Sequence, residues 1–500
     1  MQKENNLYTE VLELASRKSI FYPSNEIYNA PAGFWSFGPI GESIRRRVID
    51  FWRKEFVQEN EMLEIDGSIT MPEEVFKASG HLSSFVDPEV VCKNCKSRFR
   101  ADKLLSEKLN KIVPESLSVD EFNAMMKKNN IKCSSCKGDL SDVKKSSLMV
   151  QSNIRGEKNF YLRPEACQSI FLEFLRMTKT MRVTLPKGIA QIGKAFRNEI
   201  SPRQSILRSI EFSQMEAEIF FNPEKINDIE DFKLIENYKL RILRVDKKEI
   251  EEINCKDLVQ KKIISGELPC YFLAKEQQFY EKLGIPKDKM RFRELNKDDR
   301  AFYSKESFDF EVLTSVGWLE LSANNNRQDH DLKGHSDGSK QDLSFSDDGK
   351  KFIPHIFEVS IGVDRSLYAI LELSFIKEKE RNVLKLNPRL SPYDCAVFPL
   401  VNKDGMDLEA KKLVKILRDN LYEVFYDDSG SVGRRYRRMD EVGVKVCVTV
   451  DGETLKDKTV TLRDRDSMKQ VRIKIDELSC VLNQMICFDK ELKEFGKVIN

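Results

Sequence analysis

Two stretches between residues 187 and 221 constrain the fold more than any other part of the chain. In "AQIGKAFRNE" and again in "LRSIEFSQMEAEIFF", apolar residues alternate with small or polar ones. Alternation with a period of two is typical of strands, because successive side chains point to opposite faces. The intervening "ISPRQSI" carries Pro202 and predicts a loop of about six residues. We therefore expect an antiparallel hairpin.

One face of this hairpin combines charges with small residues. If odd positions of the first strand pair with even positions of the second, then Arg197, Glu199, Arg208, Phe212 and Glu216 share a surface. This surface is either an exposed strand with a surface ion pair or the floor of a ligand site, where small residues leave room. Guanidinium groups bind phosphates, a ring stacks on a base and a carboxylate accepts from an exocyclic amine. The floor interpretation therefore favours a nucleoside triphosphate.

A third element extends the candidate site. In "HIFEVSIGVDRSLYAILEL", Glu358, Ser360 and Gly362 alternate along a predicted strand, and Arg365 begins an apolar helix. Gly362 would allow close backbone approach to a ligand, and Arg365 becomes a third candidate phosphate ligand. The sequence contains no GxxxxGK[ST] loop and no GxGxxG after a strand, which argues against a P-loop or a Rossmann site.

Four cysteines stand in two CxxC pairs, "CKNC" (Cys92, Cys95) and "CSSC" (Cys133, Cys136). Four thiolates at this spacing suit a tetrahedral zinc ion, and four protein ligands leave no open position, which indicates a structural site. An iron–sulfur cluster and a redox pair are the alternatives. We expect residues 88–150 to form a zinc-binding insert.

Composition favours a cytosolic globular protein of roughly two to four domains. The net charge of +2 confines any nucleic-acid contact to local patches. The start, "MQKENNLYTE", lacks the apolar core of a signal peptide, and no apolar run is long enough to span a bilayer. Eleven cysteines, an odd number, in such a chain indicate reduced thiols.

Changes in composition and in the pattern of apolar residues along the chain predict the domain organisation. Residues 39–57 form an amphipathic helix that packs either on its own domain or in an interface. Lys- and Glu-rich residues 222–295 predict a helical insert, and Gly/Ser/Asp-rich residues 333–351 predict a mobile loop. Beyond "NPRLSP", strands alternate with helices, which predicts a separate α/β domain with a largely parallel sheet at 391–500, after a catalytic domain at 1–390.

The helix with "FGPIG", the hairpin "FRNE…R…EF" and the strand–helix "EVSIGVDR" resemble motifs 1, 2 and 3 of class II aminoacyl-tRNA synthetases. "EIYNAPAGFWSFGPIG", "YLRPEACQSIFLEF" and "DDSGSVGRRYRRMDEVGVKVCVTVD" are similar to glycyl-tRNA synthetases of the archaeal and eukaryotic dimeric type. The resemblance implies an α+β catalytic domain on an antiparallel sheet and a C-terminal α/β anticodon-binding domain. It implies glycine–tRNA ligase activity with ATP, Mg²⁺ and tRNA(Gly), in a cytoplasmic homodimer.

The resemblance also assigns roles to individual residues. Arg197 would hold the ATP α-phosphate, and Arg208 and Arg365 the outer phosphates; Arg197 and Arg365 would be the catalytic pair. Glu199 would accept from the adenine amine, Phe212 would stack on adenine, and Glu320 would lie near the magnesium ion. The implied ATP-binding residues are Arg197, Asn198, Glu199, Leu207, Arg208, Phe212, Glu320, Leu321, Asp364 and Arg365. The implied glycine-binding residues are Arg100, Glu165, Phe212, Glu216, Arg327, Glu358 and Ser360, with Arg327 a candidate for the carboxylate.

Other functions share some of these features. Prolyl, threonyl and histidyl enzymes use the same ATP machinery, but Glu165, Glu216 and Glu358 suit a bare ammonium ligand. A synthetase-like regulator would usually lack the motif 2 or motif 3 arginines, which this chain has. A zinc-dependent nucleic-acid-binding module accounts for the cysteines and leaves the hairpin unexplained.

In the C-terminal part, the predicted helix "VGRRYRRMDEVG" is a candidate RNA-binding element. Its arginines would hold phosphates, and Tyr436 would stack on an unpaired base. The alternative is a solvated basic helix paired with neighbouring carboxylates. The four arginines are Arg434, Arg435, Arg437 and Arg438.

Overall fold

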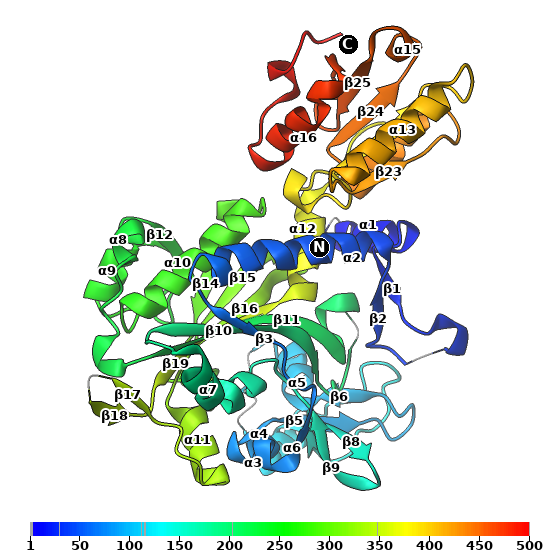
Figure 1. Cartoon of the computed structure of the whole chain (residues 1–500). Helices are drawn as coiled ribbons and strands as arrows, with labels where there is room; N and C mark the ends of the chain where they lie inside the picture. Colours follow the sequence, from blue (N-terminus) through cyan, green and yellow to red (C-terminus); the bar gives the residue numbers. More distant parts are fainter. Residues whose placement is uncertain are drawn as a thin grey trace.

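A computed structural model describes residues 4–29, 31–111, 113–114, 117–202, 204–347 and 349–499. A large N-terminal part is built on a nine-stranded sheet, and a smaller C-terminal part on a five-stranded sheet (Figure 1). Among the described residues, no helix combines the length and the apolar character needed to cross a membrane.

The nine-stranded sheet carries the candidate site. Its strands are β3 (Leu63–Ile65), β10 (Lys187–Phe196), β11 (Glu211–Phe221), β12 (Lys239–Leu243), β13 (Glu251–Asn254), β14 (Met290–Glu294), β15 (Glu306–Thr314), β16 (Gly317–Gln328) and β19 (His355–Gly362). They are ordered β13-β12-β14-β15-β16-β19-β11-β10-β3. The pairing is antiparallel except at β3–β10 and β12–β14, so the sheet that we predicted as antiparallel is mixed and mostly antiparallel.

The hairpin β10–β11 has the expected register. Gln191 lies opposite Glu216 and Ala195 opposite Phe212, so odd positions face even ones. The first strand ends at Phe196, earlier than predicted, and residues 197–210 form a longer loop. Arg197, Glu199 and Arg208 therefore lie in this loop at the mouth of the hairpin, where backbone freedom lets their side chains turn toward one another.

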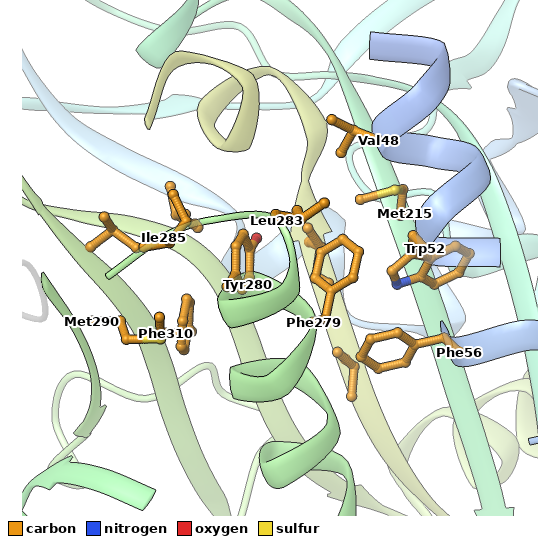
Figure 2. Packing of buried hydrophobic residues seen from close by; sticks show 14 of the residues in the cluster. Val48, Trp52, Phe56, Met215, Phe279, Tyr280, Leu283, Ile285, Met290 and Phe310 are labelled. Carbon is orange, nitrogen blue, oxygen red and sulfur yellow. The ribbon is translucent and has the colours of Figure 1, made fainter. Parts of the chain in front are cut away.

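The two faces of the sheet are covered by different helices (Figure 1). On one face lie α1 (Glu4–Arg17), α2 (Pro39–Trp52), α10 (Glu267–Lys282) and α12 (Val363–Ser374), and on the other lie α7 (Gln168–Met181) and α11 (His330–Ser339). Figure 2 shows Trp52 and Phe56 packed against Phe279 and Met215 in the first layer. The amphipathic helix at 39–57 thus packs on its own domain, which is one of the two arrangements that we considered from the sequence.

Residues 222–295 need a correction. They contain α8 (Phe232–Ile235), α9 (Cys255–Gln260) and α10, but also strands β12, β13 and β14, which extend the central sheet. In "KLRIL", charges alternate with Leu240 and Ile242, both fully buried, so the period is two rather than helical. We predicted helices because this segment is rich in Lys and Glu, and composition alone does not show the alternation that identifies these strands.

The predicted mobile loop at 333–351 is wrong for its first half. Residues up to Ser339 belong to α11, and short strands β17 (Phe345–Asp347) and β18 (Lys350–Phe352) follow. A Cβ at Gly334 would lie 2.4 Å from the Ala78 carbonyl oxygen of α3 (Glu73–Ala78). Gly334 therefore allows α11 and α3 to pack closely. The glycine that we interpreted as a loop residue is present because of this helix contact.

The region expected as an insert at 88–150 has its own small core. It comprises β5 (Val86–Val91), β6 (Arg98–Arg100), α5 (Ala101–Leu109), α6 (Val119–Lys128) and β7 (Lys144–Ser147). The strands form a sheet in the order β6-β5-β7, and Val90, Leu105 and Phe122 are buried beneath it. The two CxxC pairs lie at its end.

The C-terminal part follows the predicted alternation of strands and helices. Its elements are β22 (Cys395–Pro399), α13 (Met406–Asp419), β23 (Val424–Tyr426), α14 (Val432–Val442), β24 (Val446–Val450), α15 (Thr454–Asp457), β25 (Thr459–Asp464), β26 (Gln470–Lys474) and α16 (Leu478–Cys487). β23, β22 and β24 are parallel, whereas β25 and β26 are antiparallel additions. Arg47 of α2 forms an ion pair with Asp394 (3.0 Å), which ties this part to the catalytic sheet.

Candidate active site

Three of the predicted phosphate ligands lie around the hairpin mouth. Arg197 stands between the rings of Phe85 and Phe212, with its Cζ atom 5.2 and 5.3 Å from their centroids. Its Nε donates to the Pro164 carbonyl (3.1 Å), and its NH2 lies 3.9 Å from Glu165 Oε1. Arg208 donates to Glu199 (2.7 Å). The two side chains therefore compensate each other's charge in the loop.

Arg365 lies in the first turn of α12, which follows β19 directly. Its Nε donates to the Leu207 carbonyl (3.0 Å) and its NH1 to the Glu320 carbonyl (3.1 Å). The predicted ATP-binding residues Leu207 and Leu321 bury their side chains, so they offer ATP only backbone groups. Asp364 is also buried and accepts from the Ser213 amide (3.1 Å). Through Oδ2 it therefore anchors the start of α12 to β11, while Oδ1 has no partner among the described residues.

The space above Gly193 is already filled. A Cβ at Gly193 would lie 2.0 Å from NH2 of Arg163, which is itself 1% exposed and donates to the Lys194 and Gly67 carbonyls (2.8 and 3.1 Å). The expectation that small residues leave room for a ligand is therefore corrected at this position. Gly193 makes room for a buried arginine that ties the loop after β9 (Glu157–Leu162) to the hairpin.

Deeper along the sheet, a chain of hydrogen bonds ends on Glu216. The Ala166 amide donates to Gln214 (3.1 Å), the Gln214 amide donates to Ser360 (3.2 Å), and Ser360 donates to Glu216 Oε1 (2.7 Å). Glu216 is fully buried, and its pKa is raised to about 7, first by burial and then by the charge of Glu165. A cation entering here would meet a carboxylate that has little other compensation.

Glu165 lies near Glu216 and is surrounded by hydrogen-bond donors and positively charged side chains. Tyr303 donates to its Oε1 (3.2 Å), and His81 Nε2 lies 3.4 Å from its Oε2. Burial opposes ionisation of this carboxyl, but His81, Arg327 and Arg197 together lower its pKa. Glu165 is therefore a fixed negative charge beside Glu216.

Arg327 is fully buried and its guanidinium is fully engaged. It forms a bidentate pair with Asp331 (2.7 and 2.9 Å) and donates through NH1 to Glu358 (2.8 Å). Asn325 donates to the other oxygen of Glu358 (2.7 Å), whose pKa burial nevertheless raises to about 8. This arrangement suits Arg327 for holding carboxylates of the protein in place.

Two further predicted site residues, Arg100 and Asn198, have partners outside the hairpin. Arg100 forms ion pairs with Asp87 and Asp102 (3.0 and 2.9 Å), both buried near the cysteine-bearing region. Asn198 is exposed, and its backbone amide donates to the Leu148 carbonyl (2.8 Å). Asn198 thus fixes the hairpin loop against the segment that follows β7.

Carboxylates also gather at Glu320, the predicted neighbour of magnesium. Glu320 is exposed and lies opposite Glu311 on β15, at a bulge between Phe310 and Glu311. Burial, and then the charge of Glu320, raises the pKa of Asp309 well above its ordinary value. An all-oxygen donor set of this kind fits Mg²⁺. Arg291 and Arg293 bind Glu311 (2.7 and 2.8 Å), and Arg293 also binds Asp309 (2.6 Å). Glu320 is the exposed member of this set, and its Oε2 lies 3.4 Å from Arg365 NH1.

A cavity of about 530 Å³ adjoins the carboxylate pocket. Tyr303 and Arg327 form the wall between the two, with the Arg327 Cζ atom 3.7 Å from the Tyr303 ring centroid. His330, Lys305 and Lys333 line its outer side. This cavity thus lies on the solvent side of Tyr303 and Arg327, against residues of α11 and β16.

The four cysteines converge as their spacing predicts. The Sγ atoms of Cys92, Cys95, Cys133 and Cys136 all lie within 4.8 Å of one another. Backbone amides of Cys95 and Cys136 point at Cys92 and Cys133 Sγ, each at 3.5 Å. Four sulfurs bound at about 2.3 Å to one tetrahedral zinc ion would lie about 3.8 Å apart, so little movement would be needed.

Several site residues escaped the sequence-based prediction. His81, Tyr303, Asn325 and Asp331 each contact a predicted site residue. For Asn325 and Asp331 a signal existed, since each lies within four residues of Arg327. For the others, only the tertiary fold brings the partners together.

Comparisons with known proteins agree with this geometry. A family model described as "tRNA synthetase class II core domain (G, H, P, S and T)" matches residues 149–374. Another, described as "Anticodon binding domain", matches residues 394–485. A solved structure, the RNA-binding domain of threonyl-tRNA synthetase from Cryptosporidium parvum Iowa II, covers 94% of this chain and 97% of its own. Its TM-score of 0.60 at 19% identity shows a shared fold.

Curated relatives match the whole chain. It is 35% identical to the glycine–tRNA ligase of Methanocaldococcus jannaschii, over 97% of this chain and 100% of that protein. It is 36% identical to the glycine–tRNA ligase of Archaeoglobus fulgidus, over 98% of this chain and 99% of that protein. The chain therefore belongs to the glycyl-tRNA synthetase family, in its archaeal type.

Proposed function

We propose that the hairpin mouth binds ATP and that the carboxylate pocket beside it binds glycine, as the two halves of one adenylation site. As a member of its family, the enzyme activates glycine with ATP and transfers it to tRNA. The observation that carries the proposal is the fully buried Glu216, which lies on the same strand face as Phe212 and beside Ser360. The amino-acid dependence of pyrophosphate exchange tests it.

The reaction requires two successive displacements. The glycine carboxylate attacks the α-phosphorus of ATP, the bond to the bridging oxygen breaks, and pyrophosphate leaves with the electron pair. A ribose hydroxyl at the 3′ end of tRNA(Gly) then attacks the carbonyl carbon of glycyl-adenylate, and AMP leaves. No side-chain base is needed in the first step, because the nucleophile is already ionised, so positioning supplies much of the rate.

The charges around the hairpin mouth suit this transition state, in which negative charge spreads over the phosphoryl oxygens. Arg197 would hold the α-phosphate, while Arg365 and Arg208 would hold the outer phosphates. Phe212 would stack on adenine, and Glu199 would accept from its amine. Glu320 would hold Mg²⁺ with oxygens of ATP, and the bound ion would supply positive charge near the leaving pyrophosphate.

The pocket would select glycine by leaving no room for a side chain. The ammonium group would lie between Glu216 and Glu165, where two carboxylates compensate one positive charge. Glu358 and Ser360 close the same face of the sheet, and Arg327 holds Glu358 and Asp331 in place rather than binding the substrate carboxylate directly. A methyl group on the substrate would meet these rigidly hydrogen-bonded groups, and steric exclusion can then discriminate beyond the ~1–3 kcal/mol of one methylene.

We also propose a structural zinc ion bound by Cys92, Cys95, Cys133 and Cys136. Their converging sulfurs and the amide–sulfur contacts fit this ion, and it would supply folding free energy to the small domain at 88–150. Metal analysis of purified protein is expected to give about one zinc per chain, and Cys133→Ser should reduce this value to near zero. A metal-free protein with full activity, or an iron chromophore, would contradict the assignment.

For tRNA recognition, the structure changes the residues that we propose. Arg435 is 2% exposed and donates to the Pro399 carbonyl (2.6 Å), and the Tyr436 hydroxyl lies 2.6 Å from Thr449 Oγ1. Arg435 is therefore structural, which corrects its prediction as an RNA ligand, and Tyr436 is held against β24 by its hydroxyl group. A hollow of about 450 Å³ on α13 instead offers Lys411, Lys415 and the ring of Tyr426. Cations around a partly exposed ring suit an unpaired base and its phosphate.

Charge reversal on α13 is therefore expected to weaken tRNA binding selectively. The double variant Lys411→Glu/Lys415→Glu should raise the KM for tRNA roughly 10-fold or more and lower the salt dependence of binding. Glycine-dependent pyrophosphate exchange should be unchanged. In the matched variant Arg434→Glu/Arg437→Glu, on α14, the KM for tRNA should stay within about threefold of the wild-type value. The reverse pattern would place recognition on α14.

We further propose a cytoplasmic homodimer, as the resemblance implies. Ile27 and Tyr28, between β1 (Phe21–Pro23) and β2 (Trp35–Phe37), are 86% and 81% exposed, which suits a subunit contact. All eleven cysteines are free, which suits a reducing compartment.

A further inference from the structure

One buried glutamate on the face of the glycine pocket has no role so far. Glu218 lies two residues after Glu216 on β11 and directly opposite Glu358 on β19, so the three carboxyl groups share one face. It is fully buried, and its other neighbours on the sheet are the apolar Ile189 and Phe220. Glu218 thus marks the inner end of the pocket, where polar groups give way to the apolar layer under α7.

This cluster of buried carboxyl groups has more hydrogen-bond acceptors than donors. Both oxygens of Glu218 and Oε2 of Glu216 are buried and have no partner among the described residues. Buried acceptors without donors cost on the order of 1–3 kcal/mol each. The unpartnered Nε2 of Gln191, opposite Glu216, could serve one of these oxygens and would leave two. A donor is therefore missing at the inner end of the pocket.

A proton on Glu218 supplies that donor. Glu358 already receives hydrogen bonds on both oxygens, from Arg327 and Asn325, and Glu216 receives one from Ser360. Glu218 receives none, so of the three it gains least from a negative charge. An oxygen of Glu218, one of Glu216 and the Cys167 sulfur lie within 4.8 Å of one another, so a change of side-chain torsion brings the two carboxyl groups together.

We propose that Glu218 is a positioning residue of the glycine pocket, an un-ionised acid that donates its proton to Oε2 of Glu216 and thereby holds Glu216 ionised and oriented. Each carboxylate oxygen has two lone pairs, so Glu216 keeps acceptor capacity for the substrate ammonium. The inference rests on the proposed glycine site.

The charges around Glu218 support this protonation state. Burial is the main factor that raises its pKa well above the ordinary value, and the negative charges of Glu358, Glu216 and Asp331 add to it. Arg327 is the cation that opposes them, and it is already committed to Asp331 and Glu358. The Cys167 thiol, whose pKa burial and Glu216 raise, is neutral and adds no positive charge.

Two substitutions separate the proposed role from mere packing. Glu218→Gln keeps a neutral donor of the same shape, and its KM for glycine should stay within about threefold of the wild type. Glu218→Leu removes the donor and should raise the KM for glycine roughly 10-fold or more, with the KM for ATP nearly unchanged. The matched control is Glu276→Gln, a fully buried glutamate bound by Asn324 on the opposite face, which should change neither constant.

The pH profile gives a readout that a structural role would not move. A hydrogen bond to ionised Glu216 lowers its pKa, so losing the donor raises that pKa. The acid limb of kcat/KM for glycine should therefore shift to higher pH by about one unit in Glu218→Leu and stay in place in Glu218→Gln. An unchanged limb and an unchanged KM for glycine in a folded Glu218→Leu protein would overturn the proposal.

Infrared spectroscopy decides the question even if Glu218→Leu fails to fold. The wild-type spectrum minus that of Glu218→Gln at pH 8 should contain the C=O stretch of one protonated carboxyl group. A carboxylate band in its place would mean that Glu218 is ionised, and the inference would fail. If the wild type itself showed no glycine-dependent exchange, the proposed glycine site would fail instead, so the two failures are distinguishable.

Discussion

Replacing Arg365 with alanine is expected to lower glycine-dependent pyrophosphate exchange on the order of 1,000-fold, mainly through kcat. The guanidinium is fixed by the Leu207 and Glu320 carbonyls before any ligand arrives, so it needs little reorganisation when charge develops on the phosphates. Arg197→Ala should have an effect of similar size, because Arg197 is held between Phe85 and Phe212 next to the Glu165 carboxylate.

The control for these variants is Arg176→Ala. The Arg176 side chain is 71% exposed on α7 and pairs with Glu173 of the same helix, so its loss should leave exchange unchanged. Thermal unfolding of each variant should show that the fold is retained. Full exchange activity in both Arg365→Ala and Arg197→Ala would remove the ATP site from the hairpin mouth.

Glu216→Gln is expected to raise the KM for glycine roughly 100-fold, since removing one charged partner of a buried pair costs on the order of 3 kcal/mol. The KM for ATP should change little, because Glu216 lies beyond Gln214 from the adenine-stacking position at Phe212. Steady-state exchange kinetics with each substrate varied in turn measure both constants. Equal effects on the two constants would move Glu216 out of the glycine pocket.

The same carboxylate predicts a pH dependence. Glu216 must be ionised to bind an ammonium group, and its pKa is raised to about 7. The kcat/KM for glycine should therefore increase with pH up to about 7 and level off above it. In Glu216→Gln this acid limb should disappear. A flat profile for the wild type would mean that another group balances the substrate charge.

The sequence predicted the parts of the site that repeat with a short period. The register of β10 with β11, and the shared face of Glu358 and Ser360, follow from alternation along single strands. The pairing of β11 with β19, which adds Glu216 to that face, is seen only in the fold. The same reasoning failed at Gly193, because a small residue records only that space is needed, and the occupant, Arg163, comes from a different segment. A local sequence pattern predicts which side chains share a face of a strand. It does not predict which residue from another segment packs against that face.

Helical charge was harder to interpret than strand charge. Arg435 and Met439 lie four residues apart on α14 and are both buried, so an arginine there serves the fold. In residues 222–295 a high charge content suggested helices, although alternation in "KLRIL" identified a strand. In both cases the burial of individual positions, which depends on tertiary packing, decided the outcome.

The most direct test of the account is ATP–pyrophosphate exchange with each amino acid supplied in turn. The account predicts exchange with glycine and, at equal concentration, on the order of 100-fold less with alanine, because a methyl group meets rigid hydrogen-bonded walls. The measurement needs neither tRNA nor a variant, so it isolates the adenylation site. Equal exchange with glycine and alanine, or exchange with a larger amino acid in place of glycine, would contradict a pocket built from Glu165, Glu216 and Glu358.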